Sequence, residues 1–301
     1  MRNSATDRVI VSLSAFWVGI AAFGMSAGSA MAGDTSVLPP VASDWSQEQG
    51  ARVRVIAASV VPNGEASRRI YAGVEIDLDD GWKTYWRNPG SSGVPPRIEF
   101  DGSGNLAKAE LMFPAPVRFK DRDGDTVGYK KHVVLPVALT PSDPSKPISL
   151  KVSAEFGICR EICVPVQPVL SLIVPPEVAK ASDEGLLPTA LARVPLPSAS
   201  AESAPRLETV SVTLAGAKPQ VVIDARFPGR SAEGDIFLEA PDGIWIPLPQ
   251  PSGAGSNGAR RFVVDLDDGA DLKDLQGRRI RVTLVGSDGQ SETSFKMVEA
   301  K

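Results

Sequence analysis

The chain has 301 residues, with 32 Lys and Arg against 36 Asp and Glu, which gives a formal net charge of −4. This length suggests one large domain or two modest ones, and no basic patch stands out that would indicate nucleic acid as a partner. Prolines (26) and glycines (27) are frequent and scattered, which favours many short strands joined by turns over long helices.

The first 32 residues have the layout of a secretory signal. Arg2 and Arg8 precede an apolar run over residues 9–23, and an A-x-A motif ends at Ala32. We therefore expect cleavage after residues 1–32, export, and no permanent membrane span after cleavage. An uncleaved membrane anchor is the alternative, but the apolar run is shorter than the ~20 residues that a bilayer span needs. Disulfides persist in the compartments to which such chains are exported.

A first series of strands follows the signal. Residues 33–49 are polar and contain proline, which predicts a flexible leader. Short alternating or apolar segments bounded by turn residues then predict strands over 52–61, 68–79, 95–100, 107–113, 126–139, 148–156 and 166–174. Seven short strands of this kind indicate an antiparallel β-sandwich over residues 50–176.

A second series of strands occupies the C-terminal third. Residues 177–205 are rich in Ala, Ser and Pro and predict a linker with a short helix near 185–193. Residues 206–301 predict another all-β domain, which has no Cys, no His and no obvious polar cluster. We interpret it as a packing or spacer module. The predicted fold is therefore all-β, with two antiparallel β-sandwich domains in tandem.

The only two cysteines, Cys159 and Cys163, are four residues apart. Four steps along a straight strand cover about 13 Å, whereas a disulfide needs Cα atoms within roughly 7 Å, so a bond between them requires a bend. Strand-like sequence precedes the pair, and prolines 165 and 168 follow it. We therefore expect residues 160–162 to form a tight loop between two antiparallel strands, with the cysteines facing each other.

The chemistry of the pair stays open on spacing alone. So short a disulfide loop stabilises little, and a strained or exposed bond is easily reduced, which favours a working thiol pair. Arg160 would favour the thiolate, while Glu161 would oppose it. A structural disulfide is the main alternative, and a Cu(I) site is another. We expect no zinc site, because the only histidine, His132, lies in a strand-like run and is interpreted as a surface residue.

Four blocks in the first domain resemble a known family. They are GWKTYWRNPGSSGVPP (81–96), LMFPAPVRF (111–119), VGYKKHVVLPV (127–137) and FGICREICVPV (156–166). Together they resemble the periplasmic N-terminal domain of the thiol:disulfide interchange protein DsbD, and its relatives of the ScsB type (suppressor of copper sensitivity) in particular. The second β domain also looks like the paired sandwiches of ScsB-type proteins, although no motif matches there.

The resemblance implies a fold and a function. The family's domain is an immunoglobulin-like sandwich, so two such domains in tandem are expected. By position, Cys163 corresponds to the cysteine that forms mixed disulfides with partners, and Cys159 to the resolving cysteine. The implied partners are periplasmic thioredoxin-like or disulfide-isomerase proteins and a membrane electron donor. No counterpart of the family's membrane domain stands in these 301 residues, so that donor is expected to be a separate protein. The resemblance implies no cofactor and no permanent metal.

Two further expectations concern the surroundings of the pair. Family members shield the cysteines with a loop that carries an aromatic residue, and the matching residues 120–125 contain none, so we do not expect shielding by that loop. The aromatic block 82–86 is mainly expected to be core, but Trp86 and Arg87, together with Tyr129, are candidate partner-docking residues. The alternative functions are a binding or chaperone-like module with a structural disulfide, and periplasmic copper handling.

Overall fold

The computed structural model describes residues 41–61, 68–90, 92–121, 124–178, 185–197, 204–229 and 234–299. The predicted signal peptide, residues 1–32, lies outside these ranges. Within them, no helix is long and apolar enough to cross a membrane.

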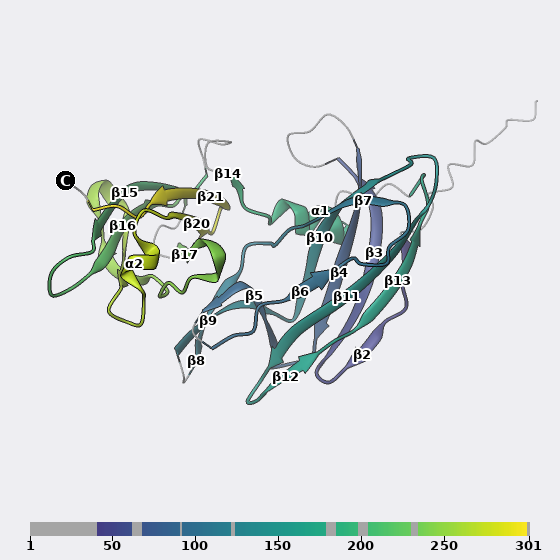
Figure 1. The fold of residues 1–301 in the computed structure, drawn as a ribbon, viewed down its shortest axis with the longest axis horizontal. Helices are drawn as coiled ribbons and strands as arrows, with labels where there is room; N and C mark the ends of the chain where they lie inside the picture. The colour runs from purple at the N-terminus through teal and green to yellow at the C-terminus, as the bar shows by residue number, and fades with distance from the viewer. Residues whose placement is uncertain are drawn as a thin grey trace, which may run out of the picture. The chain divides into compact units, whose positions relative to one another are not determined.

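The first sandwich is built from two sheets (Figure 1). One has the strand order β1-β3-β4-β10-β7, with β2 paired to β3. Its strands are β1 (Val41–Ala42), β2 (Ser46–Glu48), β3 (Ala51–Val60), β4 (Arg69–Leu78), β7 (Leu106–Leu111) and β10 (His132–Pro141). The pairing is antiparallel throughout this sheet.

The other sheet of the first sandwich carries the cysteines. Its order is β12-β11-β5-β9-β8, and β6 and β13 also pair with the long strand β11. Its strands are β5 (Lys83–Gly90), β6 (Arg97–Glu99), β8 (Val117–Asp121), β9 (Gly124–Lys130), β11 (Ile148–Cys159), β12 (Cys163–Val166) and β13 (Val169–Val174). The two sheets pack face to face because alternate side chains of a strand point to opposite faces. Along the whole of β13, for example, exposed and buried residues alternate.

The second sandwich has two four-stranded sheets. One contains β14 (Leu196–Pro197), β17 (Asp235–Glu239), β20 (Arg279–Gly286) and β21 (Gly289–Lys296), and the other contains β15 (Arg206–Thr213), β16 (Gln220–Arg226), β18 (Gln250–Ala254) and β19 (Arg260–Asp265). The single departure from antiparallel pairing among the described strands is β14, which runs parallel to β21. The short helix α2 (Leu272–Leu275) adds Leu275 to the core of this sandwich. The predicted all-β fold with two immunoglobulin-like sandwiches in tandem is confirmed.

The leader prediction is wrong for residues 41–49, which form β1, β2 and the turn after them. The polar composition of this segment gave no sign of two contacts that it makes with β3. The ring of Trp45 lies 4.4 Å from the Arg52 guanidinium and 4.3 Å from that of Arg54, and the amide of Ser43 donates to the carbonyl of Val55. Cation–π contact and ladder hydrogen bonds therefore hold this segment to β3. Residues 33–40 of the leader lie outside the described ranges.

The predicted linker contains an ordered helix. The sequence predicts a short helix near residues 185–193, and α1 spans Leu186–Ala192. Its two buried residues, Leu187 and Ala190, join a small apolar cluster on the outer face of the first sandwich with Ile56 and Val134. The helix therefore covers part of the β3-β4-β10 face.

Candidate functional site

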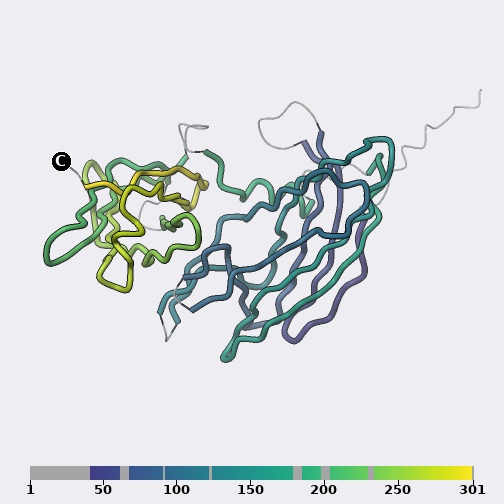
Figure 2. Tube along the Cα trace, in the orientation of Figure 1, coloured from purple at the N-terminus to yellow at the C-terminus, as the bar shows by residue number. Residues whose placement is uncertain are grey.

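The two cysteines form a disulfide at the end of the β11–β12 hairpin. Cys159 and Cys163 are register partners across the hairpin, and their Cα atoms are 4.1 Å apart. Residues 160–162 make the connecting loop, in which the Arg160 amide donates to the Ile162 carbonyl. The predicted hairpin, with the cysteines facing each other at its mouth, is confirmed. Figures 1 and 2 place this tip at one end of the first sandwich.

The two sulfur-bearing residues differ in their exposure. Cys159 is only 3% exposed, whereas Cys163 is exposed. The difference follows from the sheet: Cys159 has β5 on its other side, where it pairs with Lys83, while β12 lies at the edge. Cys163 is therefore the cysteine of the pair that is open to solvent, and Cys159 is covered.

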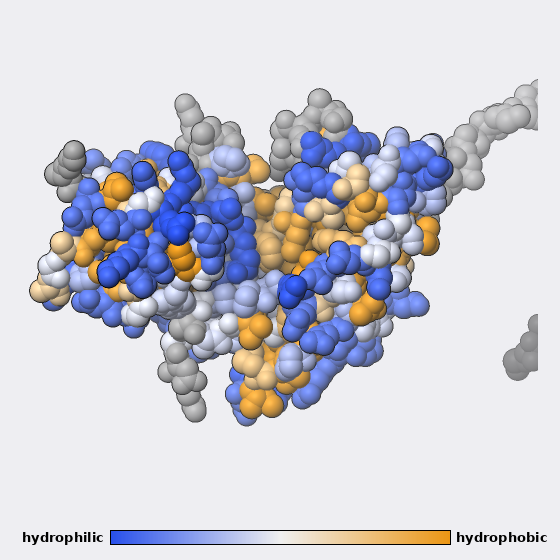
Figure 3. All heavy atoms as spheres, in the orientation of Figure 1, coloured by the Kyte–Doolittle hydropathy of each residue, from blue (hydrophilic) through white to orange (hydrophobic). Residues whose placement is uncertain are grey.

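The tip beside Cys163 exposes one large apolar side chain, Ile162, next to the charged side chains of Arg160 and Glu161. Ile162, in the loop itself, is 67% exposed. In the space-filling view, apolar side chains lie beside hydrophilic ones at the end of the first sandwich where the hairpin is (Figure 3). The exposed cysteine and an exposed aliphatic side chain therefore lie next to each other at the tip of the hairpin.

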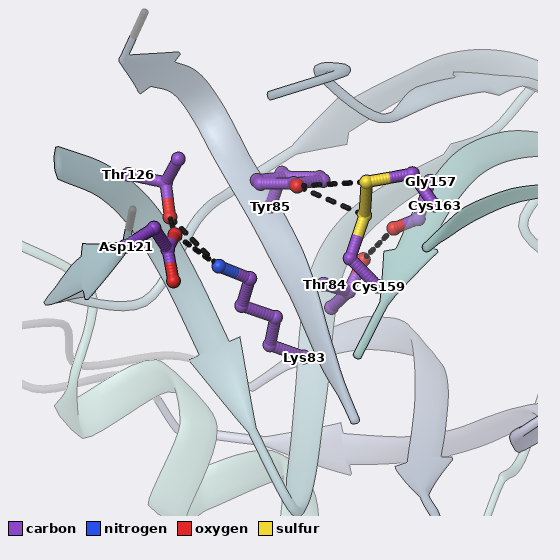
Figure 4. The surroundings of a disulfide bond; sticks show 8 residues. All are labelled: Lys83, Thr84, Tyr85, Asp121, Thr126, Gly157, Cys159 and Cys163. Atoms are coloured by element: carbon purple, nitrogen blue, oxygen red, sulfur yellow. Dashed lines mark hydrogen bonds and ion pairs between the residues drawn. A yellow bond between two sulfur atoms is a disulfide. The ribbon is translucent and has the colours of Figure 1, made fainter. Parts of the chain in front are cut away.

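Tyr85 on β5 covers the disulfide. Its hydroxyl donates to Cys159 Sγ at 2.9 Å and lies 3.4 Å from Cys163 Sγ (Figure 4). Two glycines make room for the ring: a Cβ at Gly157 would stand 3.4 Å from it, and one at Gly93 would stand 2.6 Å from it. Burial, and then the negative charge of Asp121, raise the pKa of Tyr85, so the hydroxyl stays protonated and remains a donor.

A charged group lies on the other side of Tyr85 (Figure 4). The Lys83 ammonium forms an ion pair with Asp121 and donates to Thr126 Oγ1 at 3.1 Å. Burial by itself would raise the pKa of Asp121, but the hydrogen bonds from Lys83 and Thr126 outweigh burial and hold it below its usual range. The Lys83 nitrogen is 5.9 Å from the centre of the Tyr85 ring. The phenol therefore stands between a fixed ion pair and the sulfurs.

The hairpin loop is held from the side by Arg160. Its guanidinium lies 5.6 Å from the centre of the Trp82 ring. That ring packs directly against Gly50, where a Cβ atom would stand only 2.4 Å from it. Next to the loop, Thr84 Oγ1 donates to the Gly157 carbonyl at 2.8 Å. These contacts fix the backbone on both sides of Cys159.

The three predicted docking residues do not form a free surface. Trp86 is completely buried, and Tyr129 is 5% exposed with its hydroxyl donating to the Pro114 carbonyl. Arg87 forms ion pairs with Glu239 and Glu292 of the second sandwich. The docking prediction is therefore wrong for Trp86 and Tyr129, because side chains on the inner face of β5 and β9 pack into the core. The guanidinium of Arg87 is engaged within the chain.

Sequence reasoning placed Tyr85 only within the aromatic block and did not single it out. The signal that could have found it is strand alternation. Trp86 enters the core of the first sandwich, whereas Tyr85 reaches the sulfurs from the other side of β5, as successive residues of a strand do. What alternation could not supply is the register that brings β5 beside β11 at Cys159.

No metal centre is evident in the described part of the chain. It contains no group of three or more His, Cys, Asp or Glu side chains arranged to hold an ion. His132 lies on β10 with its side chain 38% exposed, and its Nε2 is 2.9 Å from Glu75 Oε1. The residue is thus a surface strand histidine paired with a carboxylate.

Fold and site together define a β-sandwich domain with a cysteine pair at a hairpin tip, one sulfur exposed and the other covered. Residues 56–175 match the family model described as thiol:disulfide interchange protein DsbD, N-terminal. This part of the chain is a DsbD-type N-terminal domain.

The structure is also similar to the crystal structure of the N-terminal periplasmic domain of ScsB from Proteus mirabilis. The TM-score is 0.67 at 23% sequence identity, and the match covers 87% of this chain and 100% of that one. Since the DsbD-type domain is less than half of the chain, the shared fold includes the second sandwich. No curated protein matches the chain.

Proposed function

We propose that the chain is a periplasmic thiol-disulfide exchange protein that relays electrons through Cys159 and Cys163. The electrons would come from a separate membrane disulfide reductase and pass to periplasmic thiol proteins of the thioredoxin-like or disulfide-isomerase kind. The observation that carries the proposal is the asymmetry of the pair. Cys163 is exposed beside the exposed Ile162, while Cys159 is buried and receives a hydrogen bond from Tyr85.

Loading the domain with electrons follows from this asymmetry. A donor thiolate attacks Cys163 Sγ, the bond to Cys159 breaks, and Cys159 leaves as a thiolate beneath the Tyr85 hydroxyl. The donor is now joined to Cys163 in a mixed disulfide. Its second thiolate attacks its own bonded sulfur, which frees Cys163 and leaves the donor oxidised. Two electrons have then moved to the cysteine pair, and each thiolate takes a proton according to pH.

Delivery of the electrons is the reverse sequence on another protein. The Cys163 thiolate attacks an acceptor disulfide and forms a mixed disulfide, releasing one acceptor thiolate. Cys159 then attacks Cys163 Sγ, which restores the internal disulfide and releases the second acceptor thiolate. The short Cα distance between the two cysteines favours this resolving step, because the two sulfurs stay within bonding reach.

A trapping experiment tests the proposal. In a Cys159→Ser variant the mixed disulfide cannot be resolved, so adducts through Cys163 should accumulate in periplasmic extracts and disappear on reduction. Cys163→Ser is the matched control and should trap none, because Cys159 is buried. The absence of any adduct under conditions that trap a known exchanger would contradict the proposal.

The redox potential separates exchange from a structural disulfide. A working pair should lie well above about −300 mV, the level below which structural disulfides of secreted proteins fall. A potential below that level would support the structural disulfide instead. The proposed periplasmic location, with residues 1–32 removed, rests on the signal-like N-terminus and on the family, and N-terminal sequencing of the exported protein tests it.

A further inference from the structure

Strand β5 leaves its ladder immediately after Tyr85. Tyr85 pairs with Gly128 of β9, and the next pair is Gly90 with Thr126. Four residues of β5, 86–89, therefore stand opposite the single residue 127 of β9. This β5 bulge, residues 86–89, lacks regular ladder partners on β9 and depends on other contacts for its position.

Strand β17 of the second sandwich supplies those contacts. The rings of Trp86 and Phe237 have their centres 5.7 Å apart, and Asn88 Nδ2 donates to the Leu238 carbonyl at 2.6 Å. The Arg87 guanidinium donates to both carboxylate oxygens of Glu239, at 2.9 and 2.8 Å. Three consecutive residues of the bulge thus contact three consecutive residues of β17.

Side chains on the two faces of β17 pack into different cores. Ile236 and Leu238 are fully buried in the core of the second sandwich, whereas Phe237 belongs to the core of the first. Leu248 of the second sandwich also belongs to the first core. A strand whose alternate residues enter two cores couples the two sandwiches mechanically.

The same strand reaches the other side of the redox site. Arg118 on β8 donates to both carboxylate oxygens of Asp235, at 2.9 and 2.8 Å, and its side chain is only 8% exposed. Strand β8 ends at Asp121, the partner of Lys83. β17 therefore contacts two segments next to Tyr85. One is the β5 bulge, which directly follows Tyr85, and the other is β8, which carries Asp121 of the ion pair beside the Tyr85 ring.

We propose that the second sandwich positions Tyr85 against the disulfide, with Phe237 and Glu239 acting through the β5 bulge. The inference rests on the proposed function of the cysteine pair and gives the second domain a task in it. Phe237 and Glu239 are positioning residues, because neither touches a sulfur. Without them the bulge has fewer fixed contacts, and the Tyr85 hydroxyl is no longer held within hydrogen-bond distance of Cys159 Sγ.

The test uses the full chain and a small dithiol, so it needs no partner protein. Glu239→Gln keeps the shape of the side chain and weakens its hold on Arg87. Reduction of the Cys159–Cys163 disulfide by excess dithiothreitol should slow by about threefold or more. Glu208→Gln is the matched control, since Glu208 pairs with Arg226 and Arg206 within the second sandwich. Its reduction rate should equal that of the wild type.

A double-mutant cycle distinguishes positioning from general destabilisation. If Glu239 acts through Tyr85, Glu239→Gln should have no effect on the reduction rate in a Tyr85→Phe background. Equal slowing in both backgrounds would overturn the inference. Phe237→Leu provides a second variant with the same expected pattern, and unchanged rates in both single variants would also overturn it. If the trapping experiment fails while the cycle shows coupling, the positioning inference stands and the relay does not.

Discussion

Removing the Tyr85 hydroxyl is the most direct perturbation of the site. Tyr85→Phe keeps the ring between Gly93 and Gly157 and deletes only the oxygen that lies 2.9 Å from Cys159 Sγ. Cys159 is the leaving sulfur when a thiolate attacks Cys163. The hydroxyl should therefore matter most as negative charge develops on that leaving sulfur.

The size of the effect follows from the strength of the hydrogen bond. A hydrogen bond to a charged group contributes about 1.5–3 kcal/mol. With roughly half of the charge on the leaving sulfur at the transition state, the loss is about 1 kcal/mol, which corresponds to reduction slower by about fivefold. The reduced form also loses a donor, so the reduction potential should move to more negative values.

The assay follows disulfide loss under excess dithiothreitol, with aliquots quenched by alkylation and resolved by mass. Tyr129→Phe is the matched control. It deletes a buried hydroxyl that donates to the Pro114 carbonyl, so it should lower the free energy of unfolding without changing the reduction rate. A Tyr85→Phe rate equal to or faster than that of the wild type would refute the role assigned to the hydroxyl.

Three other substitutions have expected outcomes. Gly93→Ala should slow reduction and lower the melting temperature, because its Cβ would stand 2.6 Å from the Tyr85 ring; an unchanged reduction rate would contradict the packing described. Burial alone would raise the pKa of Glu75, but hydrogen bonds from its histidine and arginine partners hold that pKa below its usual range. The unfolded chain then binds more protons, so the free energy of unfolding should fall as pH drops below about 4.3, the ordinary pKa of a glutamate, and less steeply in Glu75→Gln; parallel curves in denaturant titrations would exclude this contribution. Asp235→Asn should destabilise the chain by ~1–3 kcal/mol in urea unfolding, because the buried Arg118 loses its bidentate charged partner; a change near zero would mean that this contact contributes little.

The sequence determined the features that depend on neighbours along the chain. Alternation and turn residues predicted an all-β fold, because strand formation and chain reversal follow local chemistry. The hairpin between Cys159 and Cys163 was also predictable, since chain geometry allows a disulfide four residues apart only across a bend. The resemblance of the four blocks then implied that Cys163 forms mixed disulfides with partners and that Cys159 resolves them. Local composition failed at residues 41–49, where Trp45 gains its contacts from β3.

Only the tertiary structure decided which side chains meet at the sulfurs and which are buried. Strand order places Cys159 beside β5 and leaves Cys163 at an edge, and no local pattern specifies strand order. The same holds for Trp86 and Arg87, whose exposure depends on a strand that lies some 150 residues later in the chain. Burial and register are set by contacts between segments far apart in sequence. The sequence therefore identified the cysteine pair, and the packed sheets determined its accessibility and its hydrogen-bond donor.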